Sequence, residues 1–98
     1  MELEFVDGQY HRLETDAAET LGLDPALVKA FRMRIQGLRA ATDVRDIYAM
    51  KSWRFEKLKG KRDHQRSLRL NDQFRLILEI VEDEEGTRLL IIGIEDYH

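Results

Sequence analysis

The sequence predicts an α+β fold in which an N-terminal helical hairpin packs on a C-terminal antiparallel β-meander. Up to about residue 38 the apolar residues recur every three or four positions, as on one face of a helix. From residue 68 onward they alternate with polar residues or form short β-branched runs, as in strands. The chain has 98 residues, 43% of them hydrophobic, without a repeat or linker, so residues 1–98 are expected to form one domain.

The helical part begins with a short edge strand, because Leu3 and Phe5 alternate with acidic residues. Apolar residues spaced by three and four then predict a helix from about Gln9 to Leu21, with Gly22 as its stop.

A second helix is predicted to begin with Asp24 as its N-cap and Pro25 as its first residue. Its expected buried stripe comprises Leu27, Phe31, Ile35 and Leu38, and its expected solvent face carries Lys29, Arg32 and Arg39. The residues between Thr42 and Trp53 are compatible with one more helical turn.

The last third predicts the meander. A strand at Leu68–Leu70 is followed by a turn at Asn71-Asp72, and a long strand is expected over Phe74–Val81. The residues Asp83–Gly86 form a hairpin loop, with glycine where the backbone needs a positive φ, and lead into a last strand over Leu89–Ile94.

Charge is strongly segregated along this chain. Residues 51–75 hold nine Lys or Arg against three acids, a net charge of +6, so the remainder carries −9 within a total of −3. Such a basic segment can attract a polyanion even when the whole chain is acidic. There are no cysteines, no apolar stretch approaches the length of a membrane span, and no signal peptide is apparent, so a cytoplasmic protein is expected.

Strand alternation places two arginines on one sheet face. If Leu68, Leu70 and the even-numbered residues 74–80 face the helices, then Arg69 and Arg75 share the opposite, open face. Guanidinium donors match phosphate oxygens, so this face is a candidate seat for a phosphodiester. The alternative is that both arginines are solvated strand residues, paired with Glu79 or Glu95.

Two further segments carry chemistry. The lysine-rich loop over residues 55–62 could bring ammonium groups to a polyanion, or be an ordinary charged loop. The terminal residues Asp96, Tyr97 and His98 offer an acceptor, a stacking ring and a group that titrates near neutral pH, unless this end is simply frayed.

Three motifs in matching order and spacing resemble those of the HigB toxins, within the RelE/ParE superfamily of bacterial toxin–antitoxin systems. They are Leu58-Lys59-Gly60-Lys61-Arg62, similar to the family's Leu-Lys-Gly-Asp-Arg loop; Ser67–Leu76, similar to its turn between strands that ends in Trp-Arg-Ile; and Glu95-Asp96-Tyr97-His98, which matches its Glu-Asp-Tyr-His ending.

The resemblance implies a RelE-like fold and a ribosome-dependent endoribonuclease. Such a toxin cuts mRNA in the ribosomal A site by attack of a 2′-hydroxyl, without a metal or other cofactor, and thereby inhibits translation. Its implied partners are the ribosome, mRNA and a HigA-like helix-turn-helix antitoxin that neutralises it in a hetero-oligomer.

The resemblance also implies roles for individual residues. Lys59 would stabilise the phosphate or move a proton, Arg75 would clamp the phosphate, and Tyr97 would stack on or orient a base. Asp96 and His98 would complete the proton-handling group. The remaining candidate RNA-binding residues are Lys57, Lys61, Arg62 and Arg69.

Glu56 departs from the family pattern, because many HigB sequences have a histidine in this loop. An ionised carboxylate can accept the 2′-hydroxyl proton but cannot donate one, and Glu56 could instead form an ion pair with Lys57 or Lys59. Two alternatives therefore stay open. The chain could be a non-catalytic ParE-like toxin that acts on DNA gyrase, or an inactive homologue that binds RNA through its basic face.

Overall fold

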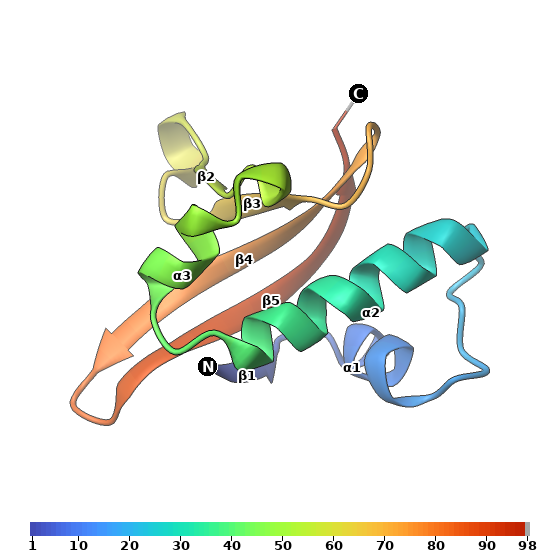
Figure 1. Ribbon diagram of the computed structural model, residues 1–98, viewed down its shortest axis with the longest axis horizontal. Coiled ribbons are helices and arrows are strands. Elements are labelled where there is room, and N and C mark those ends of the chain that lie inside the picture. The colour runs from blue at the N-terminus through green and yellow to red at the C-terminus, as the bar shows by residue number, and fades with distance from the viewer. Residues whose placement is uncertain (98) are drawn as a thin grey trace.

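Helices cover one face of a five-stranded sheet in the computed structural model, which describes residues 1–97 (Figure 1). The helices are α1 (Gly8–Thr15), α2 (Pro25–Ala40) and α3 (Val44–Ala49), with short 3-10 turns η1 (Lys51–Trp53) and η2 (Gly60–Arg62). The strands are β1 (Glu2–Phe5), β2 (Glu56–Lys57), β3 (Arg66–Arg69), β4 (Phe74–Asp83) and β5 (Gly86–Asp96). The predicted α+β class is confirmed.

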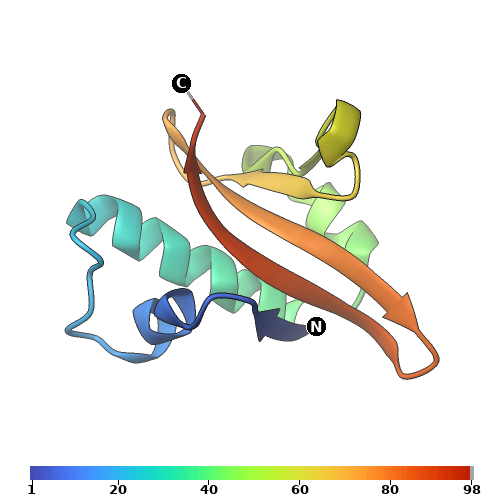
Figure 2. The ribbon, with the colours of Figure 1, turned by 180° about the vertical axis from the view of Figure 1, so that it is seen from behind.

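The sheet has the order β1-β5-β4-β3-β2. Its centre is the predicted antiparallel meander β3-β4-β5, and β1 adds a parallel edge strand beside β5. Seen from behind, β4 and β5 cross the molecule in front of the helices (Figure 2). We call this side, away from α1 and α2, the outer face of the sheet. Within residues 1–97, no helix is both long and apolar enough to cross a lipid bilayer.

The first helix ends earlier than the sequence predicts, at Thr15 rather than near Leu21. Asp16 takes an extended backbone, and its carboxylate accepts a hydrogen bond from the Ala18 amide, which offers the chain a turn in place of another helical turn. The prediction that Arg32 faces water is also wrong. Its guanidinium donates to the carbonyl oxygens of Leu13, Asp16 and Glu19 at 2.9–3.0 Å and so satisfies groups at the helix end.

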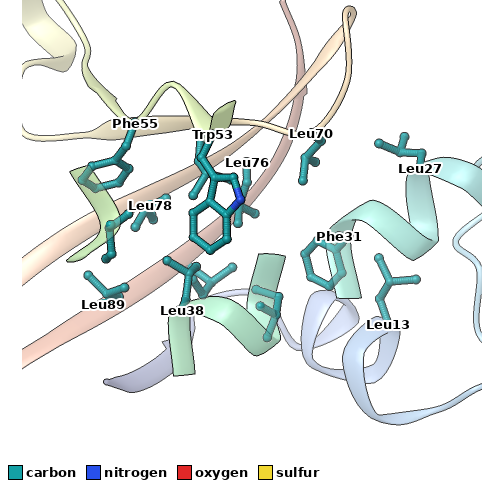
Figure 3. Close-up of a cluster of buried hydrophobic side chains, with 14 of the residues drawn as sticks. Leu13, Leu27, Phe31, Leu38, Trp53, Phe55, Leu70, Leu76, Leu78 and Leu89 are labelled. Carbon is teal, nitrogen blue, oxygen red and sulfur yellow. The ribbon is translucent and has the colours of Figure 1, made fainter. Parts of the chain in front are cut away.

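The second helix agrees with its prediction. The Asp24 carboxylate accepts from the Ala26 amide, Pro25 occupies the first turn, and the whole predicted stripe is buried. This stripe meets the inward side chains of the meander in one core, which also includes Trp53 and Phe55 (Figure 3). The third helical turn, α3, is fixed by a capping box between Asp43 and Asp46.

The segment after Trp53 was predicted to be loop, but it contains a two-residue strand, β2, that pairs with β3. The prediction missed it because Glu56 and Lys57 are both exposed and show no apolar pattern.

One irregularity decides where the end of β5 points. Ile77 pairs with Gly93 but Leu78 pairs with Ile91, so Ile92 is an extra residue in β5. Such a bulge shifts side-chain alternation by one position. Leu89 and Ile91 enter the core before it and Ile94 packs against the core after it, so the residues at 95 and 97 project to the outer face.

Candidate functional site

Arg75 stands at the centre of the candidate site. It pairs across β4 with Arg69 on β3 and with Glu95 on β5, so the three residues form one row on the outer face. The prediction that Arg69 and Arg75 share a face is confirmed.

The side chain of Arg75 is held by neutral groups. Its Nε donates to the Ser67 hydroxyl at 2.8 Å, and its Nη2 donates to the Arg54 carbonyl at 2.5 Å. Its guanidinium carbon lies 5.3 Å from the centre of the Tyr97 ring, within the range of a cation–π contact. Within residues 1–97 Arg75 forms no ion pair with Glu79 or Glu95, so that part of the alternative is wrong.

The carbonyl that receives Arg75 comes from an unusual backbone. Arg54 ends η1 with φ 47° and ψ 54°, in the left-handed region that costs a non-glycine residue about 1 kcal/mol or more. Ser67 is the other anchor, and its side chain is almost fully buried, at 1% exposure. Together these residues fix where the guanidinium of Arg75 lies.

Two concave surfaces meet at Tyr97. The first, which we call the arginine hollow, has a volume of about 690 Å³ and is lined chiefly by Lys51, Ser52, Arg54, Arg69, Arg75 and Tyr97. The second, the lysine hollow, measures about 410 Å³ and is lined by Glu56, Lys57, Leu58, Lys59 and Tyr97. Tyr97, with 49% of its surface exposed, is thus a shared wall between the predicted strand arginine and the predicted loop lysine.

The Lys59 loop is folded back over the outer face. Arg62 in η2 makes a two-pronged ion pair with Glu95 on β5, at 2.9 and 2.6 Å, although β3 and β4 separate β5 in the sheet from β2, the strand before η2. The hydrogen bonds to Glu95 raise the pKa of the Arg62 guanidinium above its ordinary value. Gln65 adds a bond to Glu79 at 3.1 Å. Arg62, predicted to bind RNA, therefore holds the loop against the sheet.

The other predicted residues are distributed around this centre. Arg69 forms an ion pair with Asp72 beside the arginine hollow. Glu56 lies on β2, exposed, and forms no ion pair with Lys57 or Lys59 within residues 1–97. Lys61 is exposed in η2.

The terminal motif is only partly assembled around Arg75. Asp96 leaves the strand on the side opposite to Tyr97, and its Oδ2 accepts a hydrogen bond from Gln73 Nε2 at 2.9 Å. Within residues 1–97 it lines neither hollow. The predicted His98 lies outside the described residues.

A further cation stands behind the arginine hollow. Arg34 on α2 donates from Nε to the Arg69 carbonyl at 3.1 Å, and its guanidinium carbon lies 5.4 Å from the centre of the Trp53 ring. Burial lowers the pKa of Arg34, and the positive charge of Arg69 lowers it further. The surroundings of the hollow are therefore strongly cationic.

The sequence did not single out Lys51, Ser52, Arg54 or Ser67 as site residues. Lys51 and Arg54 were visible only as members of the basic segment, because nothing in the sequence marks the left-handed turn that gathers them beside Arg75. Ser67 was visible only as the first residue of the motif Ser67–Leu76.

Helices on one face of a five-stranded sheet, with a cationic, aromatic-walled concavity on the other, define a RelE-like toxin fold. A solved structure of a "YoeB/ParE toxin from Agrobacterium tumefaciens" matches with a TM-score of 0.59 and 18% identity, over 100% of this chain and 100% of that one. The family model of HigB-like toxins, described as "RelE-like toxin of type II toxin-antitoxin system HigB", matches residues 3–91, and the chain belongs to this family. A search of curated proteins finds no match.

Proposed function

We propose that residues 1–98 form a single toxin domain that cleaves mRNA in the ribosomal A site and so inhibits translation. The observation that carries this proposal is the shared wall at Tyr97, with the Arg75 guanidinium against the ring in one hollow and Lys59 beside it in the other. Cations on both sides of an exposed aromatic ring suit a single-stranded nucleic acid, whose phosphates need charge and whose bases need a stacking surface.

The proposed cleavage needs three contributions from side chains of the protein. Glu56 accepts the proton of the 2′-hydroxyl, which attacks the adjacent phosphorus. Arg75 and Lys59 stabilise the negative charge of the phosphorane. The bond to the 5′-oxygen then breaks, and the leaving oxygen takes a proton from His98. Asp96, which within residues 1–97 lines neither hollow and is hydrogen-bonded to Gln73, takes no direct part. The products are a 2′,3′-cyclic phosphate and a 5′-hydroxyl, and no metal or other cofactor takes part.

The family membership implies an antitoxin, and we propose a HigA-like helix-turn-helix protein as that partner, in a hetero-oligomer. Ribosome and mRNA are cytoplasmic, so we also place the protein there.

The test is to add the protein to a translating extract and to map new mRNA 5′ ends by primer extension. Cuts at or near the codon in the A site are expected, and Lys59→Ala or Arg75→Ala should reduce them by roughly 10²-fold or more. The matched controls Lys29→Ala and Arg45→Ala remove exposed cations of α2 and α3 and should cut like the parent protein.

Uncut mRNA at high protein concentration would refute the proposal. Inhibition of DNA gyrase supercoiling by the same preparation would then support the ParE-like alternative, whereas binding of RNA without cleavage or gyrase inhibition would support the inactive homologue.

A further inference from the structure

The arginine hollow holds more positive charge than cleavage of one linkage requires. Lys51, Arg54, Arg69 and Arg75 line it, and among the lining residues that the structure describes only Asp72 is acidic. The side chains of Lys51 and Arg54 have no part in the cleavage proposed above. No ion pair within residues 1–97 involves either of them. Their charges therefore remain available to a ligand.

Arg54 serves the site through its backbone and leaves its side chain exposed. The left-handed conformation turns its carbonyl oxygen to Arg75 Nη2. A glycine would give the same carbonyl at lower conformational cost. The role of the carbonyl therefore does not account for an arginine at this position. The guanidinium that arginine adds lines the hollow.

The register of the strands separates the two hollows along the sheet. Glu56, beside Lys59, pairs with Ser67 on β3, whereas Arg69 and Arg75 form the row two residues further along. Two residues of a strand span about 7 Å. Tyr97 stands between the hollows and borders both, so a strand of RNA that lies across its ring reaches one hollow on each side.

We propose that Lys51 and Arg54 form a second phosphate subsite in the arginine hollow, which grips the phosphodiester next to the one held by Arg75 and Lys59. The ligand is single-stranded RNA with at least two consecutive phosphodiesters, and Tyr97 stacks on the base between them. The forked donors of Arg54 and the ammonium of Lys51 match phosphate oxygens, and the hydroxyl of Ser52 and the amide of Asn71 add neutral donors. This subsite rests on the proposed function for its ligand class and extends it from one phosphate to two.

The experiment uses fluorescein-labelled 2′-O-methyl trinucleotides, which the protein cannot cleave because they lack a free 2′-hydroxyl. One probe carries two phosphodiesters, and in two others a neutral methylphosphonate replaces the first or the second linkage. Affinities are measured by fluorescence anisotropy at low salt. The wild-type protein should bind the fully charged probe at least tenfold more tightly than either neutralised probe.

The key variant is Arg54→Gly, which suits the left-handed backbone and keeps the carbonyl for Arg75 while removing the guanidinium. Combined with Lys51→Ala, it should abolish the loss of affinity caused by one of the two methylphosphonate replacements and leave the loss caused by the other intact. The slope of log affinity against log salt should fall by about 0.7, because the double variant neutralises one phosphate fewer. Arg54→Lys should restore part of the affinity, and Arg45→Ala should change nothing.

Equal binding of all three probes by the wild-type protein would overturn the inference, as would an unchanged penalty pattern in the Arg54→Gly/Lys51→Ala protein. Preferential binding of a poly-glutamate peptide at the same residues would also overturn it. Binding of the probes needs neither the ribosome nor cleavage, so a difference in affinity between the probes can be observed even when mRNA remains uncut. If mRNA is cut but all three probes bind equally, only the second phosphate subsite is refuted.

Discussion

Arg75 owes its orientation to neutral partners, and this is what leaves its charge available. A carboxylate in the place of Ser67 would hold the guanidinium equally well but would compete with a phosphate for it. The Ser67 hydroxyl and the Arg54 carbonyl accept its hydrogen bonds without adding negative charge, and within residues 1–97 these bonds use Nε and Nη2 only. Nη1 therefore remains for a ligand.

Replacing Ser67 by alanine tests this positioning. The Nε of Arg75 would lose its 2.8 Å partner in a nearly buried position, and a hydrogen bond to a charged group is worth about 1.5–3 kcal/mol. We expect cleavage of mRNA in a translating extract to fall at least tenfold, since 1.36 kcal/mol corresponds to a factor of ten in rate. Thr87→Ala, an exposed strand position, is the control. Full activity of Ser67→Ala would show that Arg75 needs no support from β3.

Among the elements, the bulge in β5 does most to assemble the site. In a regular ladder residues 91, 93, 95 and 97 would share the core face, and neither Glu95 nor Tyr97 could reach its partner. The bulge also needs glycine at 93, where φ is 157° and an added Cβ would lie 2.6 Å from a ring carbon of Tyr10 on α1. Gly93 therefore serves both the packing of α1 on the sheet and the bulge that orients the site residues.

Insertion of one alanine between Ile94 and Glu95 should undo what the bulge achieves. The core up to Ile94 is untouched, but Glu95 and Tyr97 would turn to the helix side and lose Arg62 and Arg75. Cleavage should fall by roughly 10²-fold, the penalty for a misplaced catalytic group, while thermal unfolding shows a folded protein. An alanine inserted between Glu84 and Glu85, in the exposed hairpin, should leave cleavage unchanged. An active Ile94 insertion would contradict the role assigned to the bulge.

The elements also explain how far the sequence could lead. The α2 stripe, the meander and the shared face of Arg69 and Arg75 were predictable because their periodicity is long and regular. The bulge was not, because residues 89–92 are all apolar and give no alternation that could show a shift. The left-handed backbone at Arg54 was not predictable, because arginine ordinarily avoids this conformation. The early end of α1 depends on side chains of Asp16 and Arg32 that compete with the helix for backbone groups.

At the scale of the whole molecule, charge is sorted to opposite ends. The hairpin between β4 and β5 lies beside β1, and their acidic residues Glu2, Glu4, Asp83 and Glu85 border one hollow. The strands β2 and β3, which supply residues to the two hollows, lie toward the other end of the sheet (Figure 1). A protein with this polarity presents its basic end to a polyanion and turns its acidic end away, even though its net charge is −3.

Trp53 links η1, which supplies Lys51 and Ser52 to the arginine hollow, to α2, because its indole ring packs on Gly37. A Cβ at position 37 would lie 2.4 Å from Trp53 Cη2 and 2.8 Å from its Cζ2. Helix propensity alone would make Gly37→Ala stabilising by about 1 kcal/mol, whereas overpacking a well-filled core costs about 1–3 kcal/mol. The steric term should win, because the nearest atoms belong to a rigid, 7% exposed indole ring.

We therefore expect Gly37→Ala to lower the free energy of unfolding by up to about 2 kcal/mol in urea titrations, which is the largest net value of these two effects. It should also weaken binding of the two-phosphate probe, because a displaced indole moves η1 and with it Lys51 and Arg54. Gln36→Ala, at the neighbouring exposed position of α2, should change neither quantity. In the double variant Gly37→Ala/Trp53→Leu the two penalties should be less than additive, since the smaller side chain removes the clash. A Gly37→Ala protein as stable as the parent would mean that α2 and η1 are not packed as closely as this contact requires.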